Sequence, residues 1–473
     1  MALEGLKPEK VFYFFEEINK IPRGSGNERA VSNYLVNFAK ERNLKYIQDD
    51  VLNVVIYKDG TGNSEKPVIL QGHMDMVCEK NENVVHDFLA DPIDMYVDGD
   101  LLRARGTTLG ADNGIAVAMS LAILDAKDIK HPPLEVLITI GEETGMEGAK
   151  FIEGEYFKGD TLINIDNSEE SKFIISCAGG VRAKVTYELE HEYESGNLYE
   201  ISVSDLKGGH SGADIDKHRG NAVEILARII REATREYRFK LVEINGGNKD
   251  NAIPREAKAK VLFPEENSDI ISIINLINVE FMGKDTPTIT SKMTEVKDIQ
   301  CIDEELSKKI INSLILMPNG PLAMSSDIEG LVETSSNLAS IQTTDDFIIV
   351  KLSLRSSVAS AMLYIAKKVE AIGEITGAKV CLYQFYNGWQ YSAESKIRDI
   401  FLECHKDVYG KNAEATAIHA GLECGILSER LGDLDMISIG PNIFDLHTPE
   451  ERLDIPSTER VYNLLKNVLG KLA

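Results

Sequence analysis

The chain has 473 residues, 43% of them hydrophobic, which is more apolar material than a single core holds, so two or three domains are expected. Its 76 acidic residues outnumber 51 basic residues and give a formal net charge of −25. This charge repels phosphate backbones and anionic lipids. Nucleic acid and membrane surfaces are therefore not expected as partners.

The six cysteines are scattered along the chain without any C-x-x-C spacing. This pattern predicts reduced thiols, and neither a disulfide framework nor a thiolate zinc site. The first 22 residues contain no basic region followed by a long apolar stretch, because Glu16 and Glu17 interrupt the apolar run. We therefore expect no signal peptide, no membrane span and a cytoplasmic protein.

The N-terminal part of the chain alternates between helical and strand patterns. Apolar residues at helical spacing predict helices over 7–21 and 27–43, and two strands around a turn follow within 45–60. Continuous apolar runs predict buried strands within 66–77, 133–140 and 161–166, and a helix rich in small residues covers 112–126. Strands that alternate with helices indicate an α/β domain with a mostly parallel central sheet.

The pattern changes near residue 181, where strands begin to alternate polar and apolar residues. Strands at 198–206, 239–244 and 257–263, with a helix at 221–233, indicate an antiparallel sheet with one exposed face. A similar set of elements follows within 287–385, which suggests two tandem units. The α/β pattern then returns, with helices at 395–410 and 457–472 around a strand at 433–440. We therefore expect an α/β domain of residues 1–180 and 389–473, interrupted by an inserted α+β domain of residues 181–388.

Five short segments place acids or histidines after predicted strands or at a predicted helix start. They are GHMD (72–75), GADNG (110–114), GEETG (141–145), NIDN (164–167) and LHTPEE (446–451). In open α/β sheets, ligands bind beyond the carboxyl ends of the strands. Three of these segments follow apolar strands directly, so they are expected to converge at one edge of the sheet.

His73 and Asp75 lie two residues apart, so on an extended chain their side chains point to the same face. This spacing suits a metal-bound imidazole whose second nitrogen donates to a supporting carboxylate. The alternative is a polar strand end at which the histidine bonds to its neighbour.

Each of the other segments also has a structural alternative. Asp112 could be an ordinary helix N-cap, Asp166 a turn residue and His447 a loop histidine. Glu142 and Glu143 could be two surface acids in a turn. Adjacent carboxylates at the end of a buried strand repel each other, however, which favours one metal ligand and one general base.

The combined set favours chemistry over these alternatives. Two histidines, two aspartates and a glutamate supply nitrogen and oxygen ligands that suit Zn²⁺ or Mn²⁺. Five ligands can serve two cations if one carboxylate bridges them. Such a site polarises a carbonyl group and delivers hydroxide to it.

The five segments, in this order and with a large insertion before the last, resemble the co-catalytic zinc exopeptidases related to aminoacylase and carboxypeptidase G. Within that family they are most similar to the bacterial aminoacyl-histidine dipeptidase branch. The resemblance covers essentially the whole chain, including GGHSG (208–212) and HAGLECG (419–425). It implies a zinc exopeptidase fold in which the inserted domain is a lid.

The resemblance also implies a ligand set. Asp112 would bridge two cations, with His73 and Asp166 completing one site and Glu143 and His447 the other. The cations would be Zn²⁺ by preference, with Mn²⁺ or Co²⁺ as alternatives.

The same resemblance assigns catalytic roles to two further acids. Asp75 would orient His73, and Glu142 would take a proton from the attacking water and pass it to the leaving amine. Asn113 stands where members outside the dipeptidase branch often carry a lysine, which favours the dipeptidase branch.

In the lid, His210 matches a histidine that reaches the scissile carbonyl. Asn251 and Arg355 match groups that hold polar atoms of the substrate, and an arginine fork suits the C-terminal carboxylate of a dipeptide. Glu423 is the expected substrate contact of the 419–425 segment. The alternatives are a loop histidine for His210 and a strand-end charge for Arg355.

The sequence therefore predicts a cytosolic metallo-dipeptidase that hydrolyses unblocked dipeptides and prefers Xaa-His, including β-Ala-His. A broader dipeptidase or an N-acyl amino acid deacylase could use the same site. A dinuclear phosphoesterase is disfavoured because the chain lacks the N-H-[DE] segment of those sites. A binding protein that kept only the fold is disfavoured because all seven expected ligand and catalytic positions are present. Both a monomer and a homodimer are compatible with the lid.

Overall fold

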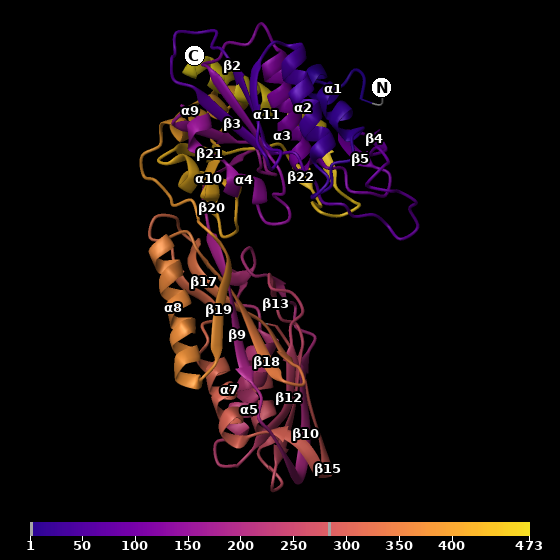
Figure 1. The fold of residues 1–473 in the computed structure, drawn as a ribbon, viewed down its shortest axis with the longest axis vertical. Helices are drawn as coiled ribbons and strands as arrows, with labels where there is room; N and C mark the ends of the chain where they lie inside the picture. The colour runs from indigo at the N-terminus through magenta and orange to yellow at the C-terminus, as the bar shows by residue number, and fades with distance from the viewer. Residues whose placement is uncertain (1–2, 282–284) are drawn as a thin grey trace. The chain divides into compact units, whose positions relative to one another are not determined.

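The computed structural model describes residues 3–281 and 285–473, and these form two compact units (Figure 1). Unit 1 comprises Met1–Ser176, Tyr391–Ala417 and Leu422–Ala473. Unit 2 comprises Cys177–Gln390 and the short segment Ile418–Gly421. The predicted boundaries place this short segment in the first domain, within residues 389–473. Among the described residues, no helix combines the length and the apolar character that crossing a membrane requires.

Unit 1 is built on an eight-stranded mixed sheet whose middle is parallel. Strand β3 pairs in parallel with β6 on one side and β7 on the other, and β7 pairs in parallel with β21. In sheet order the strands are β1 (Lys45–Gln48), β2 (Val54–Lys58), β6 (Leu134–Thr139), β3 (Val68–His73), β7 (Thr161–Asn164), β21 (Asp435–Ser438), β8 (Lys172–Cys177) and β20 (Glu414–Ile418). Every residue of β3 and β6 is buried, as their continuous apolar runs predict.

Seven α-helices belong to unit 1, and Figure 1 shows helices on both sides of its strands. They are α1 (Glu9–Asn19), α2 (Arg29–Glu41), α3 (Ala111–Asp125), α4 (Glu147–Phe151), α9 (Lys396–Tyr409), α10 (Glu423–Leu431) and α11 (Ile455–Leu472). Helix α3 packs on both β3 and α1, and nearly all of its residues are buried. Its small residues let it approach the sheet closely: a Cβ atom on Gly72 of β3 would lie 2.5 Å from Asn113 Oδ1 and 2.8 Å from Ala116 Cβ.

A second, four-stranded antiparallel sheet in unit 1 was not predicted. Its strands, in sheet order, are β22 (Ile443–Phe444), β23 (Arg452–Asp454), β5 (Leu101–Ala104) and β4 (Met95–Asp98). The sheet joins the 95–104 hairpin to the segment that contains His447. It therefore brings two distant parts of the chain to one end of the unit.

Unit 2 contains one continuous antiparallel sheet of nine strands. The path runs through β15 (Thr288–Ile302), β10 (His191–Ser204), β14 (Ala257–Phe263), β12 (Lys240–Gly246), β17 (Val332–Thr343), β18 (Phe347–Ser356), β9 (Gly179–Glu188) and β19 (Lys379–Tyr386), and β16 (Gly320–Met324) pairs with β17. A separate pair joins β11 (Gly209–His210) to β13 (Ala252–Ile253).

The helices of unit 2 cover one face of this sheet (Figure 1). They are α5 (Ala222–Ala233), α6 (Ile270–Phe281), α7 (Glu304–Leu316) and α8 (Ala359–Thr376), and all four contribute to one apolar cluster with the inward-facing strand residues. Alternate residues of the strands point to the opposite face, which carries polar side chains.

The predicted fold class, an α/β domain interrupted by an inserted α+β domain, is confirmed. The two predicted tandem units of the insert pair into a single sheet around a single apolar cluster. Their origin by duplication stays a prediction. All six cysteines are free, as their spacing predicts.

Because Gly72 leaves no room for a side chain against α3, Gly72→Ala should lower the free energy of unfolding by about 1–3 kcal/mol. Gly470→Ala, within α11, is the matched control. Its Cβ would lie 3.9 Å from the nearest atom, the carbonyl oxygen of Lys130, so the change should be neutral or slightly stabilising. Thermal and urea unfolding of the two variants measures the difference. Equal stability of the two proteins would contradict the close packing of α3 on β3.

Candidate metal and catalytic site

The five predicted metal ligands lie together in unit 1. His73 is the last residue of β3, Glu143 follows β6 and Asp166 follows β7, so three neighbouring strands deliver them to one edge of the sheet. Asp112 lies at the start of α3, where its backbone angles are not helical. His447 lies in the loop between β22 and β23 with φ +61°, a left-handed conformation that is uncommon outside glycine but in which histidine is enriched.

The carboxylate of Asp112 lies between the two histidines. Its Oδ1 atom is 3.3 Å from His73 Nε2, and its Oδ2 atom is 3.3 Å from His447 Nε2. His73 Nε2 is also 3.6 Å from Asp166 Oδ1, and His447 Nε2 is 3.1 Å from Glu143 Oε1. The side chains thus form two groups, each with one histidine and one further carboxylate, that share Asp112.

These donors fit divalent cations. Ligand atoms about 2.0–2.2 Å from one tetrahedral zinc ion lie about 3.3–3.6 Å from each other, which is close to the separations found in both groups. Ligand atoms of His73, Asp112 and Glu143 all lie within 4.8 Å of one another. Glu143 Oε1 is buried and takes part in no hydrogen bond, although His447 Nε2 is near, so the contact has the spacing but not the direction of a hydrogen bond.

The electrostatics of the site show an excess of negative charge. Interactions with Asp112 and Glu143 raise the pKa of His447 to about 10. Burial alone would lower the pKa of His73, but Asp166 and Asp112 raise it well above its ordinary value. Burial raises the pKa of Asp166 to about 6. The carboxylates therefore stabilise positive charge at this position.

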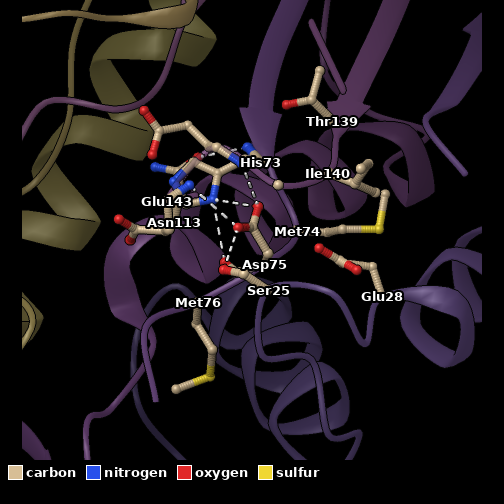
Figure 2. A network of polar contacts seen from close by, with 12 residues as sticks. Ser25, Glu28, His73, Met74, Asp75, Met76, Asn113, Thr139, Ile140 and Glu143 are labelled. Atoms are coloured by element: carbon tan, nitrogen blue, oxygen red, sulfur yellow. Dashed lines mark hydrogen bonds and ion pairs between the residues drawn. The ribbon is translucent and has the colours of Figure 1, made fainter. Parts of the chain in front are cut away.

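Asp75 connects the end of β3 to the turn after β6. Its Oδ1 atom is 3.2 Å from His73 Nδ1, and the carboxylate accepts hydrogen bonds from the backbone N–H groups of Glu142 and Glu143 at 3.1 and 3.3 Å. The Ser25 hydroxyl donates to Oδ2 at 2.7 Å (Figure 2). Acceptors thus face both ring nitrogens. If a cation took the place of the proton on Nε2, Asp75 would keep the remaining proton on Nδ1 and the Nε2 lone pair would be free to bind that cation.

Glu451 holds the loop that carries Asp112. This carboxylate is only 2% exposed and accepts four backbone N–H groups, those of residues 109, 110, 111 and 112, at 2.7–3.3 Å. Arg23, 1% exposed, donates to the carbonyl oxygens of Met74 at 3.1 Å and Gly110 at 2.6 Å. Together they fix the Asp112 loop against the end of β3.

Comparison with known proteins identifies the chain. Residues 69–471 match the model of peptidase family M20/M25/M40. The chain belongs to this family. It is a hydrolase of peptide bonds, and the resemblance inferred from the five segments is confirmed.

Two known proteins are similar over nearly the whole chain, and a third is similar over part of it. The cytosol non-specific dipeptidase of Escherichia coli is 36% identical over 99% of both chains. The crystal structure of aminoacylhistidine dipeptidase from Vibrio alginolyticus matches with a TM-score of 0.91 and 36% identity, covering 100% of this chain and 98% of the other. A probable succinyl-diaminopimelate desuccinylase of Staphylococcus epidermidis is 25% identical over 61% of this chain and 67% of its own length.

Glu142 is the predicted general base of this M20/M25/M40 peptidase, and it lies in the same turn as Glu143. Burial raises the pKa of Glu142 well above its ordinary value, opposed by His73 and reinforced by Asp166. A carboxyl group of this kind exchanges protons nearer to neutral pH than a solvated one does.

The predicted lid residues His210, Asn251 and Arg355 all lie in unit 2, close to Ser211. His210 Nδ1 accepts hydrogen bonds from the backbone N–H groups of Gly212 and Ala213 at 3.2 and 3.0 Å. Ser211, which was not predicted, joins the other two residues: its N–H donates to Asn251 O at 2.9 Å, and its hydroxyl lies 3.5 Å from Arg355 Nη2.

Glu423 differs from the other residues expected to contact substrate. It is fully buried at the start of α10, and its Oε2 atom accepts hydrogen bonds from Gln71 Nε2 at 2.6 Å and Thr139 Oγ1 at 2.7 Å. Burial raises its pKa to about 7. The carboxylate therefore bridges β3 and β6 beneath the ligand edge, and its contact with substrate stays a prediction.

Several residues that position the site were not predicted: Arg23, Ser25, Gln71, Thr139, Ser211 and Glu451. Glu451 lies within the LHTPEE segment, so its place in the sequence was one available signal. Ser211 likewise lies within the GGHSG segment, whereas Arg23, Ser25, Gln71 and Thr139 are ordinary polar residues whose roles depend on distant partners.

Replacing Glu451 with glutamine should weaken the affinity for divalent metal more than tenfold. The variant loses the charge that the four N–H groups surround, and its amide would direct N–H donors at backbone donors, so the Asp112 loop loses its support. Chelator-competition titration measures the effect.

Glu450→Gln is the matched control, because Glu450 is the exposed neighbour of Glu451. Equal metal affinity of the Glu451 and Glu450 variants would contradict the supporting role of Glu451.

Proposed function

We propose that the protein is a dipeptidase that uses two divalent cations and hydrolyses unblocked dipeptides, with a preference for Xaa-His, including β-Ala-His. The observation that carries this proposal is the sharing of the Asp112 carboxylate between two histidines, each with its own further carboxylate. Both relatives of 36% identity are named as dipeptidases, one of them as acting on aminoacyl-histidine.

Unit 1 would be the catalytic domain and unit 2 the lid. His73, Asp112 and Asp166 would hold one cation, and Asp112, Glu143 and His447 the other. Bound there, the cations would polarise the scissile carbonyl and make water a stronger nucleophile near neutral pH. Zn²⁺ is the first candidate for this mixture of nitrogen and oxygen donors, with Mn²⁺ and Co²⁺ as alternatives.

Glu142 would move the proton during hydrolysis. Its carboxylate would accept a proton from the attacking water and return it to the amine that leaves. Burial raises the pKa of Glu142, which makes its carboxylate a stronger base than that of a solvated glutamate. Asp75 would keep the base in place, since it accepts the backbone N–H groups of both Glu142 and Glu143.

His210 would donate a hydrogen bond to the carbonyl oxygen of the substrate. Its Nδ1 atom is already occupied as an acceptor, so a neutral ring carries its proton on Nε2. Burial, followed by the positive charge of Arg355, lowers the pKa of His210. The imidazole is therefore neutral at physiological pH and offers one donor to developing negative charge.

Arg355 would bind the C-terminal carboxylate of the dipeptide. Its side chain is only 4% exposed, and its Nε atom is buried without a hydrogen-bond partner. A buried guanidinium group with free donors is the geometry that binds a carboxylate through two parallel hydrogen bonds.

We also propose a cytoplasmic location, in line with the name of the Escherichia coli relative. Assembly as a homodimer stays a prediction.

A substrate panel tests the proposed function. After chelation and re-addition of Zn²⁺, Mn²⁺ or Co²⁺, the enzyme should cleave β-Ala-His, Gly-His and Leu-Gly, with the histidine peptides best, and should leave N-acetyl amino acids intact. The second candidate, an N-acyl amino acid deacylase, is favoured by the desuccinylase relative. It predicts the reverse order, and equal rates for Leu-Gly and Gly-His would indicate a broader dipeptidase.

Replacing Glu142 with glutamine should lower kcat by about 10²–10⁴-fold while the metal content stays unchanged, because the amide cannot carry the proton. Steady-state kinetics and elemental analysis of the same preparation measure both quantities. Glu147→Gln, a change at an exposed glutamate just beyond the same turn, is the control. A variant at position 142 that keeps full activity would refute the role of the base.

A further inference from the structure

The face of the unit 2 sheet opposite its helices carries a cluster of polar side chains around Arg355. Val181, Ala183, Leu352 and Leu354 point into the apolar cluster beneath the helices. Because side chains alternate along a strand, the intervening residues of β9 and β18 point to the other face. On this face, residues that pair across neighbouring strands lie side by side and form rows perpendicular to the strands.

The row of Arg355 crosses four strands. Ser335 of β17 pairs with Arg355 of β18, which pairs with Gly180 of β9, and Gly180 pairs with Tyr386 of β19. A neighbouring row, two residues along β18, contains Ser353, Arg182 and Tyr383.

Arg355 has no close counter-charge in the part of the chain that the structure describes. Among residues 3–281 and 285–473, no carboxylate lies within 4.0 Å of its guanidinium nitrogens. Burial, followed by the positive charge of Arg355, also lowers the pKa of Arg182, so the two guanidinium groups repel each other. A buried cation without a partner is costly unless an anion binds to it.

The Tyr386 hydroxyl makes the shortest hydrogen bond to this guanidinium. It accepts from Nη1 at 3.0 Å, whereas the Ser211 hydroxyl is 3.5 Å from Nη2, and Nε has no partner. The tyrosine thus occupies one end of the guanidinium plane. The N–H groups of Nε and Nη2 on the other edge remain available to a ligand. This edge of a guanidinium group can bind a carboxylate through two parallel hydrogen bonds.

Gly180 makes room for the tyrosine. A Cβ atom at residue 180 would lie 2.7 Å from both Cζ and the hydroxyl oxygen of Tyr386. The ring can therefore lie directly on the sheet, beside the strand that carries Arg355, only because residue 180 has no side chain.

We infer that Tyr386 is a positioning residue that determines selectivity for a free C-terminal carboxylate: its hydroxyl, seated over Gly180, orients the Nε–Nη2 edge of Arg355 toward the carboxylate of the dipeptide. The inference rests on the proposed function for the nature of the ligand. A carboxylate held equally in the ground state and the transition state affects KM and leaves kcat unchanged.

Tyr386→Phe tests the inference, because it removes only the hydroxyl and keeps the ring. With a dipeptide such as Gly-His, KM should rise about three- to tenfold, the worth of one ordinary hydrogen bond, because the guanidinium group is kept and loses only its support; kcat should stay within about twofold. With the C-terminal amide of the same dipeptide, kcat/KM should not change.

Tyr383→Phe is the matched control. Tyr383 lies on the same strand, but its hydroxyl donates to Asp250 at 3.2 Å and not to Arg355. Its KM for the dipeptide should match that of the unchanged protein. The inference fails if Tyr386→Phe leaves KM unaltered, if it impairs the amide as much as the dipeptide, or if Tyr383→Phe has an equal effect.

Arg355→Ala separates this inference from the proposed function. It should raise KM for the dipeptide by more than thirtyfold and spare the amide, since it removes the whole guanidinium group. If it does not change the preference for the dipeptide over its amide, the assignment of the carboxylate to Arg355 is wrong. If it does, and Tyr386→Phe does not, only the role of Tyr386 is wrong.

Discussion

Repulsion among carboxylates at one edge of the unit 1 sheet is the constraint on which the site depends. Four carboxylates surround His73. Those of Asp75, Asp112 and Asp166 lie 3.2–3.6 Å from its ring nitrogens, and Glu143 belongs to the same group of possible ligands. The chain neutralises some of this charge without cations: Asp75 accepts two backbone N–H groups and a hydroxyl, and Glu451 accepts four backbone N–H groups. Backbone dipoles therefore hold the supporting carboxylates, which leaves the others with the negative charge that attracts metal.

In unit 2, the buried cluster around Arg355 has a local excess of positive charge. There Arg355 and Arg182 lie on one sheet face, and Asp250 supplies a carboxylate near Arg182. A buried guanidinium group with free donors favours an anionic group such as a carboxylate.

The parts of the fold and site that could be predicted are those with a local signal. Continuous apolar runs marked β3, β6 and β7, and the polar residues directly after them marked the ligand edge. The sheet of β22, β23, β5 and β4 was missed because strands of two to four residues carry too few alternations to detect. Arg23 and Glu451 were missed because their partners lie 51 to 342 residues away, and nothing in the local sequence indicates those contacts. Glu423 was recognised as important from its segment, but burial in the protein interior has no signature in a single sequence.

The interruption of unit 1 by unit 2 has a consequence for biosynthesis. Chains fold from their N-terminus as the ribosome makes them. While unit 2 is being synthesised, His73, Asp112, Glu143 and Asp166 already exist, but His447 and Glu451 do not. Strand β21, which lies between β7 and β8 in the finished sheet, is also still absent, so β7 has an unpaired edge at that stage. The nascent chain must keep this edge from aggregating, and it cannot bring all five proposed metal ligands together until the segment after unit 2 returns to the sheet.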